Sequence, residues 1–247
     1  MSDAGVPQLG ATGLIGDSFR LLFRHFGIFF PLALAPALLV EALNIALVPA
    51  PTGDAMALTT GTLLGSLLAA LVGYVIVALL CVATLDALTG TSRSLGAYIR
   101  LAAPQALALL VLGTILSVVA GIAMLFFVVP GLYVFAQFMV WVQAVVFERA
   151  GLGGLGRAQA LTKGYRWPLV GALVILVLLF LGGMLVTAPL FALGSTGTGR
   201  LVVALLSGVV VAATNALIAI FTTLVYLRLR LFKEGKSAHD VAAQIVS

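Results

Sequence analysis

The residues that could carry enzyme chemistry in this chain are few and scattered. There are two histidines, His25 and His239, and one cysteine, Cys81, which lies inside an apolar run and is expected to be a small packing residue. The sequence has no His-Glu-x-x-His, Gly-x-Ser-x-Gly or Gly-x-x-x-x-Gly-Lys pattern, as zinc hydrolysis, α/β-hydrolase chemistry and P-loop chemistry would need. We therefore predict no catalytic residue, no metal site and no cofactor, and we do not expect an enzyme.

Polar side chains inside long apolar runs are a second source of possible chemistry. They are Glu41, Asn44, Gln137, Glu148 and Asn215. At helical spacing some of them extend into two stripes, Gln137-Trp141-Ala144-Glu148 and Asn215-Ala219-Thr222-Tyr226. A polar group in hydrocarbon needs a partner or a wet cavity, so the stripes either line a cleft or hydrogen-bond between helices, with Glu148 near the cytoplasmic interface. Glu41 lies deepest, and we expect it to be protonated or paired with Asn44 and another span.

Basic residues in amphipathic segments suggest a third chemistry, which is contact with lipid phosphate. In the clearest segment, Phe19, Leu22 and Phe23 share one helical face while Arg20 and Arg24 lie opposite. Related segments occupy 94–103 and 154–167. Such helices lie in the headgroup layer, where they either recognise anionic phospholipid or only anchor the bundle. The predicted headgroup contacts are Arg20, Arg24, Arg100, Arg157, Lys163 and Arg166.

The elements that position these residues are membrane spans, because 62% of the 247 residues are hydrophobic, 9% are charged and the mean hydropathy is +1.24. A span needs about 20 apolar residues to cross roughly 30 Å of hydrocarbon. We predict six spans, at 28–48, 63–87, 105–129, 132–147, 168–193 and 201–227. The pI of about 9.8 reflects juxtamembrane charge rather than a nucleic-acid patch.

Charge placement predicts the topology. Twelve of the thirteen Lys and Arg residues fall on one side of the predicted spans, and only Arg200 falls on the other, which places both termini in the cytoplasm. Pro130-Gly131 is predicted to be the outer turn between spans three and four. The fold is thus predicted as an all-α membrane helix bundle, six transmembrane helices in three hairpins with cytoplasmic amphipathic entry helices. Residues 1–13 form a tail without signal-peptide character, 14–233 the membrane domain and 234–247 a cytoplasmic tail.

Three segments carry a resemblance to a known family: Pro130-Gly131-Leu132-Tyr133, Val145-Val146-Phe147-Glu148, and the run from Gly154 to Trp167. In this order they resemble the membrane domain of glycerophosphodiester phosphodiesterases and of stand-alone YciC-like inner-membrane proteins. In that group a Pro-Gly turn and an acidic span end precede an Ala-Leu-x-Arg-Ser…Leu-x-x-Gly segment. Gly154 and Ala158 stand where the family usually has Ala and Ser. The resemblance implies no catalytic residue, since phosphodiesterase activity belongs to a separate soluble barrel.

Two functions are compatible with these features. The first is a non-enzymatic scaffold or accessory protein that engages anionic phospholipid, together with a membrane-protein partner or a second copy of itself. The alternative is a small transporter or lipid-translocating protein that uses the intramembrane polar residues. The Ala-, Leu-, Gly- and Val-rich composition with little Lys indicates a bacterial protein of the cytoplasmic (inner) membrane.

Overall fold

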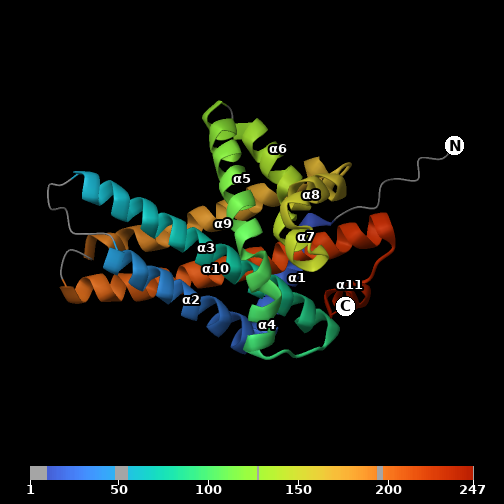
Figure 1. Ribbon diagram of the computed structural model, residues 1–247, viewed down its shortest axis with the longest axis horizontal. Coiled ribbons are helices and arrows are strands. Elements are labelled where there is room, and N and C mark those ends of the chain that lie inside the picture. Colours follow the sequence, from blue (N-terminus) through green and yellow to red (C-terminus); the bar gives the residue numbers. More distant parts are fainter. Residues whose placement is uncertain (1–9, 48–54, 127, 194–196, 247) are drawn as a thin grey trace.

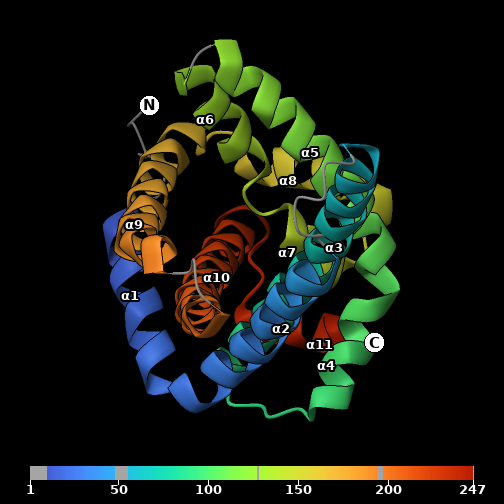
Figure 2. The same cartoon turned by 90° about the vertical axis from the view of Figure 1, so that its left-hand side faces the viewer.

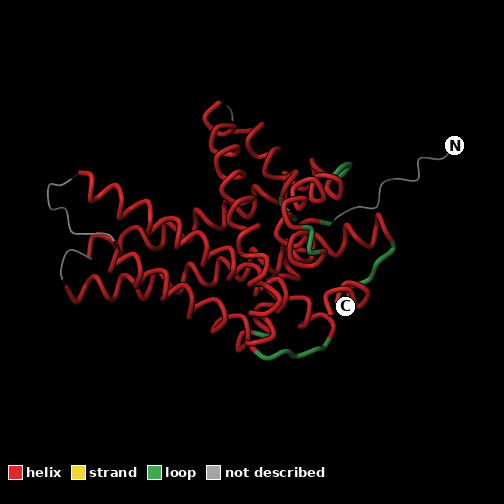
Figure 3. Tube along the Cα trace, in the orientation of Figure 1, coloured by secondary structure: helices red, strands yellow, loops and turns green. Residues whose placement is uncertain are grey.

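The computed structural model describes residues 10–47, 55–126, 128–193 and 197–246, and in these ranges every regular element is a helix (Figure 3). The α-helices are α1 Ala11–Arg24, α2 Phe26–Leu47, α3 Ala55–Thr89, α4 Leu95–Ala102, α5 Ala106–Phe126, α6 Val128–Phe138, α7 Trp141–Glu148, α8 Gly154–Thr162, α9 Arg166–Leu193, α10 Gly197–Glu234 and α11 Ala238–Val246. Short 3-10 turns, η1 Ala103–Gln105 and η2 Gly151–Gly153, precede α5 and α8. The all-helical prediction is confirmed.

Four of these helices, α2, α3, α9 and α10, run along one direction and form the main bundle (Figures 1 and 2). The central helix α10 contacts the other three. It presents the buried small residues Gly208, Ala212 and Ala216 to them, and Gly208 lies so close to Leu38 of α2 that a methyl group there would approach Leu38 Cδ2 to 2.9 Å. In lipid, the burial of apolar surface does not drive helices together. Dispersion attraction between closely packed helices takes its place, and small residues permit that close packing.

Helices occur at all three predicted entry positions, but they meet their spans differently. The axis turns by 88° between the α1 and α2 segments and by 109° between the α8 and α9 segments. The segment Leu95–Ala123, by contrast, is one continuous helix through η1. Pro104 sits in the first turn of η1, where a missing backbone N–H costs little, so it does not break the helix.

The continuous α4–α5 helix changes the architecture from the predicted one. Because α5 follows the direction of α4, the hairpin of α5 and α6 runs across the main bundle instead of along it (Figure 1), and we call it the lateral hairpin. The predicted arrangement of six spans in three alike hairpins is therefore met only in part. The predicted turn is also wrong: α5 ends at Phe126, and Pro130 and Gly131 lie inside α6, where a first-turn proline is tolerated.

The second half of the lateral hairpin agrees with the predicted span at 132–147, because Gly131–Glu148 is one of the segments long and apolar enough to cross a membrane. Within this segment a two-residue turn at Met139 and Val140 separates α6 from α7, which starts at Trp141. By length and composition, the described residues contain four helices apolar and long enough to cross a membrane, or up to six if each bent pair counts as one span.

Both ends of the described chain lie at the same end of the bundle. Gly10 lies beside Arg228 near the C-terminal end of α10, and α11 packs against α3 and α7 (Figure 1). Helices α1, α4, α7, α8 and α11 gather at this end. We call it the basic end because the twelve clustered Lys and Arg residues lie on these helices, on the loops that join them and on the adjoining ends of α9 and α10.

Tight packing of α8 on α7 gives a testable consequence at Gly154. A methyl group there would overlap Val145 Cγ2 and come within 3.5 Å of Leu112 Cδ1, and valine is a stiff neighbour. We expect Gly154→Ala to lower the free energy of unfolding in detergent by about 1–3 kcal/mol. Gly156→Ala in the same helix, where nothing lies within 4 Å, is the control and should be neutral or mildly stabilising. Equal effects of the two substitutions would contradict the packing.

Candidate functional site

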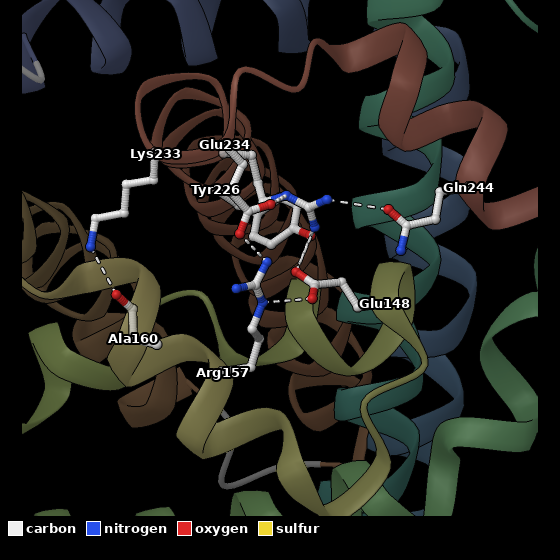
Figure 4. Close-up of polar contacts among 8 residues, drawn as sticks. Glu148, Arg157, Ala160, Tyr226, Lys233, Glu234 and Gln244 are labelled. Atoms are coloured by element: carbon white, nitrogen blue, oxygen red, sulfur yellow. Dashed lines mark hydrogen bonds and ion pairs between the residues drawn. The ribbon is translucent and has the colours of Figure 1, made fainter.

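A closed ring of four charges lies at the basic end, where α7, α8 and α10 meet (Figure 4). Glu148 ends α7, and its two carboxylate oxygens bind Arg157 Nε of α8 at 2.6 Å and Arg230 Nη1 of α10 at 2.6 Å. Glu234 pairs with the same two arginines: one oxygen accepts from Arg157 Nη2, and the other lies 2.7 Å from Arg230 Nε, as an ion pair without hydrogen-bond geometry. Signs alternate around the ring, so its four charges cancel.

The ring is deeply placed and has further partners. The Arg230 side chain is 1% exposed and that of Glu148 14%. Tyr226, one turn before Arg230, donates to Glu148 Oε1 at 2.7 Å and accepts from Arg230 Nη1 at 2.6 Å. Gln244 of α11 accepts from Arg230 Nη2 at 3.2 Å. Buried charges are tolerated only when they are paired and hydrogen-bonded in this way.

Two more cations tie neighbouring helices to the ring. Lys233 Nζ donates to the carbonyl oxygen of Ala160 at 2.8 Å (Figure 4) and to that of Lys163 at 2.7 Å, and so satisfies the C-terminal end of α8. Arg149 adopts the left-handed conformation, with φ of 51°, and ends α7. Its Nη2 donates to the Ile245 carbonyl of α11 at 3.2 Å.

A second cluster of polar side chains lies deeper in the protein, between α3, α7 and α10. Gln143 is fully buried, and its Nε2 donates to Thr222 Oγ1 at 2.7 Å and to Cys81 Sγ at 3.3 Å. Thr222 and Tyr226 belong to the α10 stripe predicted from the sequence, and each meets a polar residue of α7. Together with the charge ring they form one continuous contact, which we call the polar seam.

The predicted intramembrane residues have different environments. Glu148 is the centre of the ring. Gln137 lies at the end of α6 beside α8, where its side-chain oxygen accepts from Gln159 Nε2 at 3.0 Å. Asn215 is half-buried on α10. The side chains of Glu41 and Asn44 lie outside what the structure describes, so their predicted pairing stays a prediction.

The predicted headgroup residues divide into exposed and engaged groups. Arg20 and Arg24 of α1 are exposed and line a shallow cavity of about 220 Å³ with Asp17, which binds Arg20 Nη1 at 3.3 Å. Arg100 and Lys163 are also exposed. Arg157 belongs to the charge ring. Arg166 Nη1 donates to the Tyr133 hydroxyl at 3.1 Å, and the Arg166 guanidinium lies 5.6 Å from the centre of the Tyr133 aromatic ring.

Sequence reasoning missed three residues of the polar seam. Arg230 and Glu234 were assigned to the juxtamembrane region and the tail, and Gln143 was passed over. The spacing Thr222, Tyr226, Arg230, Glu234 was the available signal, since one polar residue per helical turn over three turns indicates a polar partner along that face.

An all-helical fold with long apolar helices, a neutral buried seam and clustered surface cations defines a multi-pass membrane protein. Comparison with known proteins adds nothing more specific, since no family model, curated protein or solved structure matches the chain. The family resemblance noted above stays a prediction.

The ring predicts a large stability loss when one member is removed. Glu148→Gln leaves Arg157 and Arg230 each with one carboxylate fewer in a poorly solvated site. We expect the free energy of unfolding in detergent to fall by about 3 kcal/mol. Asp17→Asn, which removes only the exposed pair with Arg20, should cost less than about 1 kcal/mol. A loss for Glu148→Gln as small as the loss for Asp17→Asn would contradict the ring.

The N-terminus of α11 predicts a local pH dependence. Asp240 Oδ2 accepts from Ser237 N and Oγ, both at 2.8 Å, and Asp240 N donates to Ser237 Oγ, which forms a capping box. These hydrogen bonds lower the pKa of Asp240. The stabilisation is therefore present above the ordinary aspartate pKa and is lost as the pH falls through the lowered value. Hydrogen-exchange protection of the first turn of α11 should decrease between pH 6 and 3 in the parent protein, but not in Asp240→Asn.

Proposed function

We propose that this protein is a non-enzymatic scaffold or accessory protein of the cytoplasmic membrane that engages anionic phospholipid at its basic end. The supporting observation is the charge imbalance there. Twelve Lys and Arg residues face five described carboxylates, those of Asp17, Asp86, Glu148, Glu234 and Asp240. Each of these five already binds a partner inside the protein.

The exposed part of this charge suits a membrane surface. Because α1 turns by 88° into α2, it lies across the end of a span, as a helix in the headgroup layer would. Its face toward α10 buries Leu14 and Leu22, while Phe23 is 69% exposed and Arg20 and Arg24 are exposed. An exposed aromatic ring beside two arginines is suited to the boundary between acyl chains and phosphates.

The transporter alternative has less support from the polar residues. Transport through the polar stripes requires these groups to face a substrate path. Instead, Gln143 Nε2 donates to Thr222 and the Tyr226 hydroxyl donates to Glu148 across the seam between α7 and α10, although Gln143 Oε1 is buried there without a hydrogen-bond partner. Hydrogen bonding between helices is the better account of them. With the basic end on the cytoplasmic side, as positive charge favours, both termini are cytoplasmic.

The proposal predicts selective enrichment of anionic lipid. When the purified protein is exchanged into nanodiscs of equal anionic and zwitterionic lipid, native mass spectrometry should find anionic lipid retained in excess. The variant with Arg20→Gln and Arg24→Gln should lose much of that excess, since each juxtamembrane cation contributes about 1 kcal/mol.

Arg200→Gln, in the first turn of α10 at the opposite end, is the matched control and should leave the lipid ratio unchanged. Retention without headgroup preference in the parent protein would refute the proposal. So would an equal loss in the control and the double variant.

A further inference from the structure

An apolar cavity of about 350 Å³ lies where the lateral hairpin meets the main bundle. Its wall combines α3, α5, α6, α7, α9 and α10, and it includes Trp141, Leu173 and Val177. Three hydroxyl groups also line it, and all are engaged within the protein. The Tyr74 hydroxyl and Ser117 Oγ lie 3.5 Å apart, and Thr222 accepts from Gln143 and donates to the Ile218 carbonyl. Apart from these hydroxyl groups, the residues that line the cavity are apolar.

The cavity borders the lipid-facing surface of α9. Val177 in its wall is 38% exposed, and Val174 and Leu178 beside it are 38% and 61% exposed. Hydrocarbon surrounds this surface in a membrane, and an apolar cavity does not attract water. An acyl chain is thus the available filling of matching chemistry.

A headgroup anchor lies on the same face of α9. Arg166 precedes Leu173 by seven residues and Val177 by eleven, and both separations bring side chains to one helical face. Arg166 therefore lies about 10 Å along the axis from Leu173, toward the basic end. It stacks on Tyr133, whose ring is 5.8 Å from that of Trp167, and Trp167 is 68% exposed. A cation with Tyr and Trp beside it is typical of the interfacial region.

We propose that the cavity holds one acyl chain of an anionic phospholipid whose phosphate binds Arg166. This inference rests on the proposed function, because it names a defined lipid site at the basic end. The cavity is built where the lateral hairpin leaves the bundle, so a bound chain would contact the hairpin and the bundle at once and hold them together.

The two tryptophans of the chain make the site observable. Trp141 is 7% exposed and lines the cavity, whereas Trp167 lies at the surface. In Trp167→Phe, Trp141 is the only tryptophan, and it can be excited at wavelengths where the five tyrosines do not absorb. Bromine on an acyl chain quenches tryptophan at contact, so reconstitution with brominated anionic phospholipid should reduce the fluorescence of Trp141 relative to unbrominated lipid.

Adjacent substitutions separate the cavity from the bulk lipid. Val177→Phe fills the cavity and should restore the fluorescence, with Leu173→Phe as a second filling variant from the same wall. Leu178→Phe, on the outer face of α9, should leave the quenching unchanged. No quenching in the parent, or equal quenching in the Val177 and Leu178 variants, would overturn the inference.

The headgroup part is tested by titrating brominated lipid into unbrominated lipid. Arg166→Gln should raise the anionic-lipid fraction that gives half-maximal quenching about fivefold, and Lys236→Gln, outside α10, should not. If brominated zwitterionic lipid quenches equally and Arg166→Gln has no effect, the cavity still holds an acyl chain, but the phosphate contact with Arg166 is refuted; the proposed function, tested at Arg20 and Arg24, is decided by the nanodisc experiment. If neither lipid quenches Trp141 while nanodiscs still enrich anionic lipid, the proposed function stands and the cavity site is refuted.

Discussion

The structure depends on the neutral ring of Glu148, Arg157, Arg230 and Glu234. Helix α7 is only eight residues long and α8 only nine, too short to be held by their own backbone hydrogen bonds. The ring attaches α7 to α10, the longest described helix, through Glu148 and Arg230 at 2.6 Å, and it attaches α8 to both through Arg157, which binds Glu148 at 2.6 Å and also binds Glu234. Removing one member leaves each of its two neighbours with one counterion fewer, at a site where the Arg230 side chain is 1% exposed, which is why four separate residues act as one structural unit.

The ring also separates two roles for charge at the same end of the molecule. The ring arginines have carboxylate partners and contribute no net charge, while Arg20, Arg24 and Arg100 are exposed on the short helices α1 and α4. The paired charges position the helices, and the exposed ones give the end its positive potential. Because α1 and α8 turn sharply into α2 and α9, this potential is spread across the end of the bundle.

Composition and periodicity predicted the helical class, the helices near all three entry positions and the polar stripe on α10, because these depend on local residue types and helical spacing. The lateral hairpin was not predictable in the same way. Its direction depends on whether the helix bends at Ala103–Gln105, and Pro104 there is compatible with a bend or with a continuous helix. Likewise, the sequence predicted Arg157 and Arg166 to be surface cations, because their partners come from other helices. Arg157 binds Glu148 and Glu234, and Arg166 binds Tyr133. Tertiary contacts between distant segments leave no local pattern.

The most direct test of the ring is a double-mutant cycle between Glu148 and Arg230, which are 82 residues apart in the sequence. Glu148→Gln, Arg230→Met and the double variant would be compared by their free energies of unfolding in detergent. A ring that acts as one unit predicts a coupling energy of about 1 kcal/mol or more, with the double variant less destabilised than the sum of the single variants. Additivity within about 0.5 kcal/mol would show that the two residues act independently, and it would contradict the account.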